Sequence, residues 1–296
     1  MPYRSVFRPG LFDGQAVIVT GGGSGFGRCI AHELAALGAT VMLMGRKQAG
    51  LERVAGEIAE DGGRADWLTC NIREGEEVRE AVAETVRRLG RIDGLVNNAG
   101  GQFTAPLAEI TDKGWRAVID TNLTGGFLMA RECYNQWMKG HGGAIVNMTA
   151  HFWQGMPLMG HSGAARAGMM NFTQTAALEW AADGVRVNAV SPGPCMSSGL
   201  DTYTPDFKQR LRRRAQDIPM KRLGTESEVS APVLFLLSEA SGFITGATIP
   251  IDGGLPLVKA LWPMPETARS TAYQGFHRSE VPDLFRDMAR PDGADS

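Results

Sequence analysis

The chain has 296 residues, of which 43% are hydrophobic and 21% are charged, and its formal net charge at pH 7 is −2. This near-neutral balance argues against nucleic acid or a membrane surface as a partner, and no apolar run is long enough for a signal peptide or a membrane span. These properties predict a globular protein of the cytoplasm.

Strand-like and helical patterns alternate along most of the chain. An apolar strand is expected at residues 16–20, and a helix with one apolar face is expected at 28–37. A second strand at 40–44 precedes a charged helix that ends near Glu60. Further strands are expected at residues 65–70, 94–96, 144–148, 186–190 and 248–251. This alternation predicts an α/β fold whose parallel sheet is covered by helices on both faces.

The alternating pattern ends at residues 252–254, and residues 255–296 form a C-terminal extension. Its large apolar residues are Leu261, Trp262, Met264, Tyr273, Phe276 and Phe285. Because so much apolar surface is unfavourable in water, we expect the extension to dock partly on its own domain or on a neighbouring subunit. Its last residues, from about Arg290, are expected to be disordered.

The cysteines are widely spaced and do not cluster with histidines. They are therefore expected to be buried free thiols in a reducing compartment, and no metal site is predicted. The four residues are Cys29, Cys70, Cys133 and Cys195.

A glycine-rich turn follows the first strand and opens the first helix. Its pattern, Thr20-Gly21-x-x-x-Gly25-x-Gly27, lets the backbone approach a pyrophosphate closely, because glycine lacks the Cβ atom that would block it. The helix N-terminus adds free N–H donors and a positive dipole. The sequence therefore predicts a dinucleotide site, and the alternative is a tight turn without a ligand. The residues assigned to this site are Gly21, Ser24, Gly25, Phe26 and Gly27.

Four later landmarks agree with this turn in order and spacing. They are Asn97-Asn98-Ala99-Gly100, Asn122 within Thr121-Asn122-Leu123-Thr124-Gly125, Ser191-Pro192-Gly193-Pro194, and Asp252-Gly253-Gly254. Together they resemble the short-chain dehydrogenase/reductase superfamily over residues 11–254. The resemblance implies a single Rossmann-type domain with a seven-stranded, doubly wound parallel sheet, often assembled as a homotetramer.

The same resemblance implies where a bound dinucleotide would lie. The residues expected beside it are Asn71 near the adenine, Asn98, Ala99 and Gly100 at the riboses, and Pro192 and Gly193 at the nicotinamide. At the end of the second strand, NAD enzymes place a carboxylate against the ribose 2′-hydroxyl, but this chain has Arg46 and Lys47 there. Arg46 could bind a 2′-phosphate, so NADP(H) is the predicted cofactor, and a solvated basic turn is the alternative.

The positions that carry the superfamily's alcohol chemistry are changed in this chain. The resemblance assigns proton transfer to a Tyr, lowering of its pKa to a Lys, carbonyl polarisation to a Ser, and a water relay to an Asn. Only Asn122 is retained, because Ser162 and Arg166 replace the Tyr and the Lys, and Ala150, preceded by Thr149, replaces the Ser. A serine hydroxyl is too weak an acid for that proton transfer, and arginine stays protonated. Ordinary ketone reduction is therefore disfavoured.

A subset of the superfamily lacks that Tyr because it reduces carbon–carbon double bonds conjugated to a thioester. Its members include peroxisomal trans-2-enoyl-CoA reductase and 2,4-dienoyl-CoA reductase. Several segments are similar to the first of these, among them Gly100-Gly101-Gln102-Phe103 and residues 161–168. The resemblance therefore implies NADPH-dependent reduction of the C=C bond of an α,β-unsaturated acyl-CoA. Preorganised donors would stabilise the resulting enolate, and the candidates are Asn122, Thr149 and Ser162, with Arg166 holding the ribose.

Protonation of the α-carbon requires an acid near the enolate. A bound water or His151 could supply this proton, although His151 could equally be a loop residue that lines a pocket. His161 is better explained by packing, because adjacent helix positions point to different faces. No tyrosine is expected at the site, because Tyr134 falls on a core helix pattern and Tyr203 falls in the substrate-loop region.

Two further groups of residues could bind the substrate. An acyl-binding wall or core packing would explain Phe152, Trp153, Met156 and Met159, whereas core packing is preferred for Met169 and Met170. CoA phosphates or a solvated helix face would explain the basic run Lys208, Arg210, Arg212, Arg213 and Arg214.

Two other functions remain open from the sequence. One is an NADP-dependent alcohol or 3-hydroxyacyl-CoA dehydrogenase in which His151 replaces the missing Tyr. The other is a cofactor-binding subunit without catalysis, because three of the four expected catalytic positions are changed.

Overall fold

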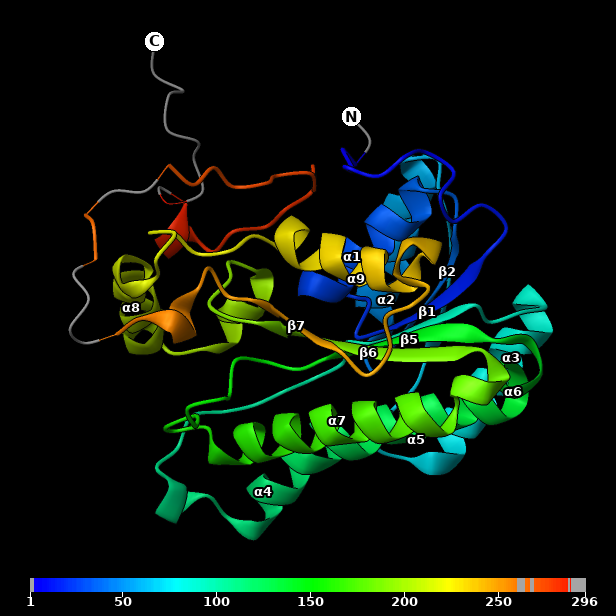
Figure 1. Cartoon of the computed structure of the whole chain (residues 1–296), viewed down its shortest axis with the longest axis horizontal. Coiled ribbons are helices and arrows are strands. Elements are labelled where there is room, and N and C mark those ends of the chain that lie inside the picture. The colour runs from blue at the N-terminus through cyan, green and yellow to red at the C-terminus, as the bar shows by residue number, and fades with distance from the viewer. Residues whose placement is uncertain (1–2, 260–263, 267–268, 287, 289–296) are drawn as a thin grey trace.

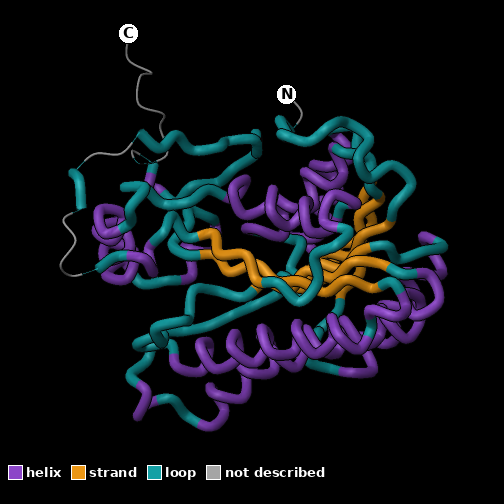
Figure 2. The backbone as a smooth tube through the Cα atoms, viewed as in Figure 1, coloured by secondary structure: helices purple, strands orange, loops and turns teal. Residues whose placement is uncertain are grey.

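The computed structural model describes residues 3–259, 264–266, 269–286 and 288 of the chain. Seven parallel strands form one sheet in the order β3-β2-β1-β4-β5-β6-β7, which Figure 2 shows as a single orange layer between helices. The strands are β1 (Ala16–Thr20), β2 (Thr40–Gly45), β3 (Arg64–Thr69), β4 (Gly94–Asn97), β5 (Gly143–Met148), β6 (Val185–Pro192) and β7 (Thr248–Ile251).

Helices cover both faces of the sheet (Figure 1). One face carries α1 (Gly25–Ala36), α2 (Gln48–Glu60) and α9 (Glu226–Leu237). The other face carries α3 (Gly75–Leu89), α5 (Gly125–Cys133) and α7 (Gly160–Glu179). Shorter helices are α4 (Asp112–Ile119), α6 (Lys139–His141) and α8 (Pro205–Arg214). The predicted Rossmann-type α/β fold with a seven-stranded, doubly wound parallel sheet is therefore confirmed.

The central strands are apolar because both of their faces are buried. All five residues of β1 are buried, with Val17 and Val19 packed on the side of α1 and α9, and Ile18 packed on the opposite side. The predicted bounds of β1 and β7 agree with the structure. Helix α1 begins at Gly25, three residues earlier than predicted, because its first turn is the glycine-rich motif and carries no apolar periodicity.

The strand order determines where ligands can bind. From β1 the chain builds outward through β2 and β3, and then returns to the other side of β1 to form β4. Val19 of β1 accordingly pairs with Leu43 of β2 and with Val96 of β4. The loops that leave β1 and β4 diverge at the carboxyl edge of the sheet, which is where open α/β sheets bind ligands.

The C-terminal extension contacts its own domain. The Thr225 hydroxyl donates to the Tyr273 carbonyl oxygen over 2.7 Å, and the buried Phe276 ring lies 5.1 Å from the His32 ring. Further along, Arg278 forms an ion pair with Asp61. Phe285 is fully buried in a cluster with five residues of the segment after β6, which are Met196, Leu200, Ala215, Ile218 and Leu223. Leu261, Trp262 and residues 290–296 lie outside the described residues.

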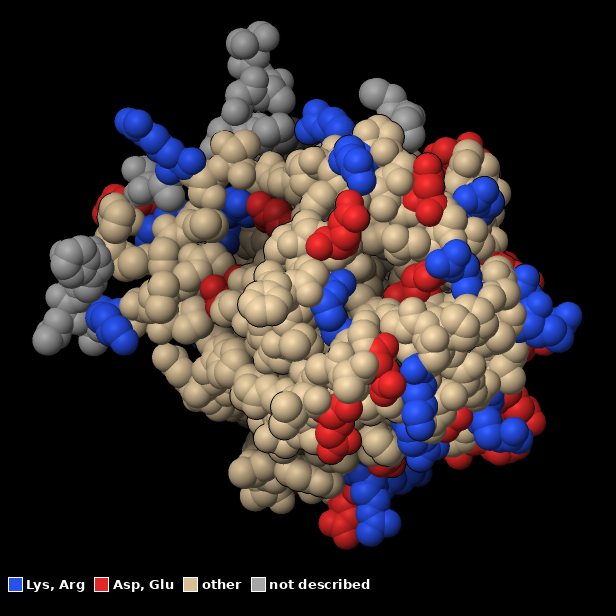
Figure 3. All heavy atoms as spheres, turned by 45° about the vertical axis from the view of Figure 1, so that its right-hand side comes forward, with Lys and Arg blue, Asp and Glu red and all other residues tan. Residues whose placement is uncertain are grey.

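The surface and the cysteines fit the composition. Acidic and basic side chains are interspersed over the face shown in Figure 3, without a patch of one sign. All four cysteines are free and buried. None of the helices in the described ranges is long and apolar enough to cross a membrane.

Glu226 at the start of α9 should make the stability of the protein depend on pH. This side chain is buried and accepts a hydrogen bond from Ser279 of the extension. Burial raises the pKa of Glu226 to about 7, and Arg28 and Ser279 oppose this only in part. Because the folded-state pKa exceeds the unfolded one, the stabilising contribution is complete below pH 4.5 and is lost as the pH rises through about 7.

Glu226→Gln cannot ionise and should remove this dependence. Between pH 4.5 and 8 the wild type should lose up to about 3 kcal/mol of unfolding free energy relative to the variant. Urea unfolding of both proteins at pH 5 and pH 8 measures the difference. An equal change in the two proteins would show that Glu226 does not titrate in this range.

Candidate functional site

The turn between β1 and α1 has the geometry of an anion site. Gly21 and Gly25 adopt positive φ angles of 66° and 52°. A Cβ on Gly27 would clash with the Gly21 carbonyl oxygen and lie 2.6 Å from Asn98 Nδ2, so this crossing of chains requires glycine. The exposed Ser24 side chain does not cap the helix, and no acidic residue lies in the first turn. The positive end of the α1 dipole therefore remains available to an anion.

The segment after β6 reaches over this turn. Gly25 N–H donates to the Ser198 hydroxyl over 3.1 Å, and Ser198 begins a short 3-10 helix, η5 (Ser198–Thr202). Phe26, also predicted to bind the cofactor, is half-buried and packs against the core between the sheet and α1. One N–H donor of the turn is thus held by a hydroxyl from a distant segment.

The loop after β4 is fastened to the glycine turn. Thr20 Oγ1 accepts hydrogen bonds from the N–H groups of Asn98 and Ala99, both over 3.0 Å. Asn98 Nδ2 donates in turn to the Thr20 carbonyl oxygen over 2.9 Å. Asn98 and Ala99 therefore position the loop through protein contacts, and the backbone around Gly100 faces the site.

Two predicted cofactor residues lie toward the β2 and β3 edge. Asn71 is half-buried, and its side chain contacts Arg73 and Glu74. Arg46 is exposed directly after β2. Among the residues that the structure describes, the Arg46 side chain has no hydrogen bond or ion pair, so its guanidinium is available to a phosphate.

Pro192 and Gly193 lie at the end of β6, where the sheet meets β7. Gly193 N–H donates to the Ile251 carbonyl oxygen over 2.9 Å, and a Cβ on Gly193 would lie 2.7 Å from the Cβ of Asp252. Pro192 accepts a hydrogen bond from the His151 N–H over 3.0 Å. These contacts hold the ends of β5, β6 and β7 together.

Asn122 lies in a widened turn, residues Asp120–Thr124, between α4 and α5. The side chain is buried, and Nδ2 donates to the carbonyl oxygens of Val118 (2.9 Å) and Gly101 (2.6 Å). Its Oδ1 accepts from the Gly101 N–H over 3.2 Å. Asn122 therefore fixes the glycine loop after β4.

Arg166 is a buried cation with few partners. Its residue surface is 9% exposed, its Nη1 donates to the Met148 carbonyl oxygen over 2.6 Å, and its buried Nε has no partner. No carboxylate forms an ion pair with it within the described ranges. Burial lowers the pKa of Arg166 to about 10, and the nearby Tyr203 opposes this, so the group stays charged at neutral pH. A Cβ on Gly100 would lie 2.8 Å from both Arg166 Nη2 and Asn122 Oδ1, so these three residues converge.

Ser162 belongs to a chain of hydrogen bonds that ends on a tyrosine. The buried Ser162 hydroxyl donates to Gln102 Oε1 over 2.5 Å, and Gln102 Nε2 donates to the Tyr203 hydroxyl over 2.5 Å. The expectation that no tyrosine lies at the site is therefore wrong. Tyr203 is 101 positions from Gln102, and no local pattern marks the contact, although Gln102 lies in a segment that the resemblance had singled out.

Thr149 and His151 follow β5. The Thr149 hydroxyl donates to the Val190 carbonyl oxygen over 2.9 Å, so this proton is committed to β6. His151 is half-buried, and its Nδ1 is buried without a partner. Burial lowers the pKa of His151, and the neighbouring Asp252 opposes this. The imidazole therefore stays largely neutral near pH 7.

His161 begins α7 inside the protein. It is fully buried, its Nδ1 accepts from the Ser162 N–H over 2.8 Å, and its ring lies edge-on to Phe103 at 4.4 Å. Its Nε2 is buried without a partner. Burial lowers its pKa, which favours the neutral ring. These contacts agree with the preferred packing role.

Apolar side chains gather on the loops after β4 and β5. The two loops are joined by a hydrogen bond from the Ala105 N–H to the Leu158 carbonyl oxygen over 2.9 Å. Phe152 stacks on the exposed Trp153 at 4.5 Å, and Met156 and Met159 of the predicted wall are half-buried. Other exposed apolar residues here are Phe103, Leu107 and Leu158. Met169 is in the core, as preferred from the sequence, and Met170 is half-buried.

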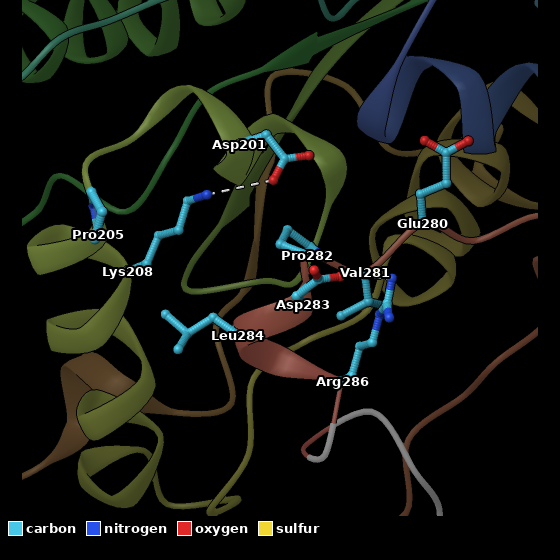
Figure 4. Close-up of a pocket in the computed structure, with 9 residues that line it drawn as sticks. All are labelled: Asp201, Pro205, Lys208, Glu280, Val281, Pro282, Asp283, Leu284 and Arg286. Carbon is cyan, nitrogen blue, oxygen red and sulfur yellow. Dashed lines mark hydrogen bonds and ion pairs between the residues drawn. The ribbon is translucent and has the colours of Figure 1, made fainter.

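Helix α8 carries the predicted basic run beside the site. Arg214, at its end, is close enough to His151 to lower the pKa of that imidazole. A cavity of about 510 Å³ lies between η5, α8 and the extension. Lys208 Nζ lies 3.5 Å from Asp201 Oδ1 in its lining, which Figure 4 draws. Of the sequence-predicted residues this cavity contains only Lys208, so it is separate from the Ser162 and Arg166 site. No group of three or more metal-ligating side chains occurs in the described part of the chain.

Comparison with known proteins agrees with this geometry. The family model described as "Enoyl-(Acyl carrier protein) reductase" matches residues 21–256. A probable 2,4-dienoyl-CoA reductase of Bacillus subtilis is 36% identical over 243 residues, covering 81% of this chain and 96% of that protein. A 3-oxoacyl-[acyl-carrier-protein] reductase of Staphylococcus epidermidis is also 36% identical, over 81% of this chain and 98% of that protein.

A solved structure is more similar in sequence. The citronellol catabolism dehydrogenase of Pseudomonas aeruginosa PAO1 is 57% identical, with a TM-score of 0.78, covering 86% of this chain and 99% of that chain. The relatives thus include reductases of C=C and of C=O bonds, so the residues of the site determine which bond is reduced.

Proposed function

Because the chain belongs to the short-chain dehydrogenase/reductase family and is therefore an oxidoreductase, we propose that it reduces the C=C bond of an α,β-unsaturated acyl-CoA with NADPH. One observation carries this choice of bond. The two positions that activate alcohols hold Ser162, whose proton is donated to Gln102, and Arg166, which cannot exchange a proton at neutral pH. The dienoyl-CoA reductase relative supports the same substrate class.

A dinucleotide fits the residues present. The uncapped N-terminus of α1 and the turn that excludes a Cβ at Gly27 suit a pyrophosphate. The Ser198 hydroxyl accepts a hydrogen bond from the Gly25 N–H, as a phosphate oxygen would. The orphaned Nε of Arg166 suits a ribose hydroxyl. Asn71 would lie near the adenine, and Pro192 and Gly193 near the nicotinamide. Bound NADPH supplies a hydride to the β-carbon of the substrate.

The residues around Gly100 would then stabilise the enolate. As negative charge develops on the thioester oxygen, the cationic Arg166 lowers its energy in a buried setting. Asn122 keeps the Gly100–Gly101 backbone in place, and Ser162 orients Gln102. Thr149 supports the end of β5 and would act as a donor only after releasing Val190.

The substrate would extend between the two loops and α8. The apolar wall with Phe103, Trp153 and Leu158 suits an acyl chain, and the exposed Arg213 and Arg214 suit the phosphates of CoA. The 57% identical relative is named for citronellol, a methyl-branched terpenoid. Branched acyl chains therefore belong in the test beside straight ones.

NADPH preference is expected to depend on Arg46. Arg46→Ala should raise the Kd for NADPH roughly 10-fold to 100-fold, because a charge-assisted hydrogen bond to the 2′-phosphate is lost. The Kd for NADH should change less than about threefold, because NADH lacks that phosphate. Fluorescence titration of both cofactors measures this, and equal losses for NADH and NADPH would contradict the assignment.

The proposed function is tested by turnover on matched substrates. NADPH oxidation is measured with straight and methyl-branched trans-2-enoyl-CoA and 2,4-dienoyl-CoA, and separately with 3-oxoacyl thioesters. NADP⁺ reduction is measured with citronellol and 3-hydroxyacyl-CoA. Preference for the unsaturated thioesters supports the proposal. Faster turnover of 3-oxoacyl thioesters or alcohols, with that activity abolished by His151→Ala, would instead support the dehydrogenase alternative. The 3-oxoacyl reductase relative favours this alternative.

We also propose assembly as a homotetramer in the cytoplasm. Trp115, Phe127 and Leu178 are exposed on α4, α5 and α7, and another copy would bury them. The four free thiols suit a reducing compartment. Light scattering should give four times the 31.8 kDa chain mass, and a monomeric mass would contradict this assembly.

A further inference from the structure

The site lacks a tyrosine on α7, but a phenol reaches it from another segment. Tyr203 directly follows η5, and its hydroxyl accepts a hydrogen bond from Gln102 Nε2 over 2.5 Å. The ring stacks on Phe207 at 4.5 Å, and the backbone N–H donates to the Leu200 carbonyl oxygen over 3.1 Å. The phenol is therefore held by its oxygen, its ring and its backbone.

The proton of this phenol is available. Because Gln102 is the donor in their hydrogen bond, the phenolic hydrogen takes no part in it, and no acceptor for that hydrogen occurs in the described part of the chain. In this arrangement Gln102 Oε1 accepts from the Ser162 hydroxyl, and its Nε2 is left to donate to the phenol.

A buried cation lies near the same oxygen. Arg166 interacts electrostatically with Tyr203, has no carboxylate partner in the described ranges, and donates only to the Met148 carbonyl oxygen. A cation beside a phenol stabilises the negative charge that develops as its proton leaves. Ser162 and Gln102 therefore position the phenol, and Arg166 supplies positive charge on the same side of the site.

The two histidines near the site are less suitable acids. His161 Nε2 is enclosed against Phe103, and Nδ1 already accepts from the Ser162 N–H. The His151 imidazole interacts with Asp252 and Arg214, and it has no hydrogen bond to the chain formed by Ser162, Gln102 and Tyr203. Neither ring is joined to Arg166.

We propose that Tyr203 is the catalytic acid of the C=C reduction, an inference that rests on the proposed function. The β-carbon receives a hydride with its electron pair, and the π electrons of the double bond move to the α-carbon and the thioester oxygen. The phenolic proton then forms the new C–H bond at the α-carbon, and the electron pair of the O–H bond stays on the Tyr203 oxygen. Solvent returns a proton to the phenolate. The C=C bond is reduced and the nicotinamide is oxidised.

Tyr203→Phe tests this role without removing the ring that stacks on Phe207. With a trans-2-enoyl-CoA and NADPH, kcat should fall about 100-fold or more, while the Kd for NADPH stays within about twofold. Tyr134→Phe is the matched control, because it removes the hydroxyl of a tyrosine that bonds to Asp183, away from the site. Its kcat should stay within about twofold of the wild type.

Stereochemistry separates proton donation from a structural effect. In D2O the wild type should place deuterium on one face of the α-carbon, whereas Tyr203→Phe should give both faces, because solvent then protonates the enolate. Product analysis by NMR measures this. Full kcat and a single labelled face in Tyr203→Phe would overturn the role of Tyr203 and leave the proposed function standing. Equal losses of activity and NADPH affinity would also overturn it. A wild type that turns over no unsaturated thioester would overturn the proposed function, and this role with it.

Discussion

Arg166→Met should abolish most of the activity and leave the fold intact. The guanidinium is a buried cation without a carboxylate partner. Burying such a charge lowers the stability of the folded protein, so we expect Arg166 to be present for function and not for stability. Methionine fills similar space and carries no charge. We expect kcat/KM to fall roughly 1000-fold, because ribose binding and enolate stabilisation are lost together. The unfolding free energy of the free protein should stay within about 1 kcal/mol of the wild type or rise.

Two further variants serve as controls for this result. Arg166→Lys keeps the charge but has fewer donors, so it should recover part of the activity. Arg116→Met removes an exposed arginine of α4 and should change neither quantity. Enzyme kinetics and urea unfolding give the two numbers for each variant. If Arg166→Met destabilises the protein by several kcal/mol and keeps most of its activity, Arg166 is structural and the account of the site is wrong.

Gly27→Ala should destabilise the protein and weaken cofactor binding at the same time. The added Cβ would meet the Gly21 carbonyl oxygen and Asn98 Nδ2, and backbone atoms cannot move aside as a flexible side chain can. We expect a loss of roughly 3 kcal/mol in unfolding free energy. The Kd for NADPH should rise at least about tenfold, because the turn must shift where the pyrophosphate binds.

Gly56→Ala is the matched control for the added methyl group. Gly56 is exposed in the middle of α2, and a Cβ there would meet no atom within 4 Å. The substitution should stabilise the protein by about 0.5–1 kcal/mol, because alanine is the better helix former. Thermal unfolding and NADPH titration compare the two variants. Unchanged NADPH affinity in Gly27→Ala would contradict the assignment of the pyrophosphate site.

The sheet could be predicted because its strands carry their signal locally. Val17, Ile18 and Val19 are apolar in succession, as a strand buried on both faces requires, and the glycine turn follows at once. The apolar pattern places the start of α1 three residues too late, because the glycines at 25 and 27 serve the turn and give no periodic signal. The local apolar pattern thus predicts the presence of a helix or strand better than it predicts the residues at which that element begins and ends.

The site could be predicted only in part, because its contacts join distant segments. The replacement of the alcohol-activating pair by Ser162 and Arg166 is visible in the sequence. The bond from Gln102 to Tyr203 and the bond from Gly25 to Ser198 depend on how the segment after β6 folds back. Thr149 was expected to be a donor, but its hydroxyl turns to Val190, and residue type alone cannot reveal that choice.

The position of an isotope label shows which bond of the substrate receives the hydride. NADPH that carries deuterium at the transferable position is incubated with the enzyme and an unsaturated acyl-CoA, and the product is analysed by mass and NMR. We predict a saturated acyl-CoA with one deuterium on the β-carbon. Deuterium on a carbinol carbon, formed from a 3-oxoacyl thioester while the unsaturated thioesters are left unchanged, would show that the enzyme reduces C=O and would contradict the account.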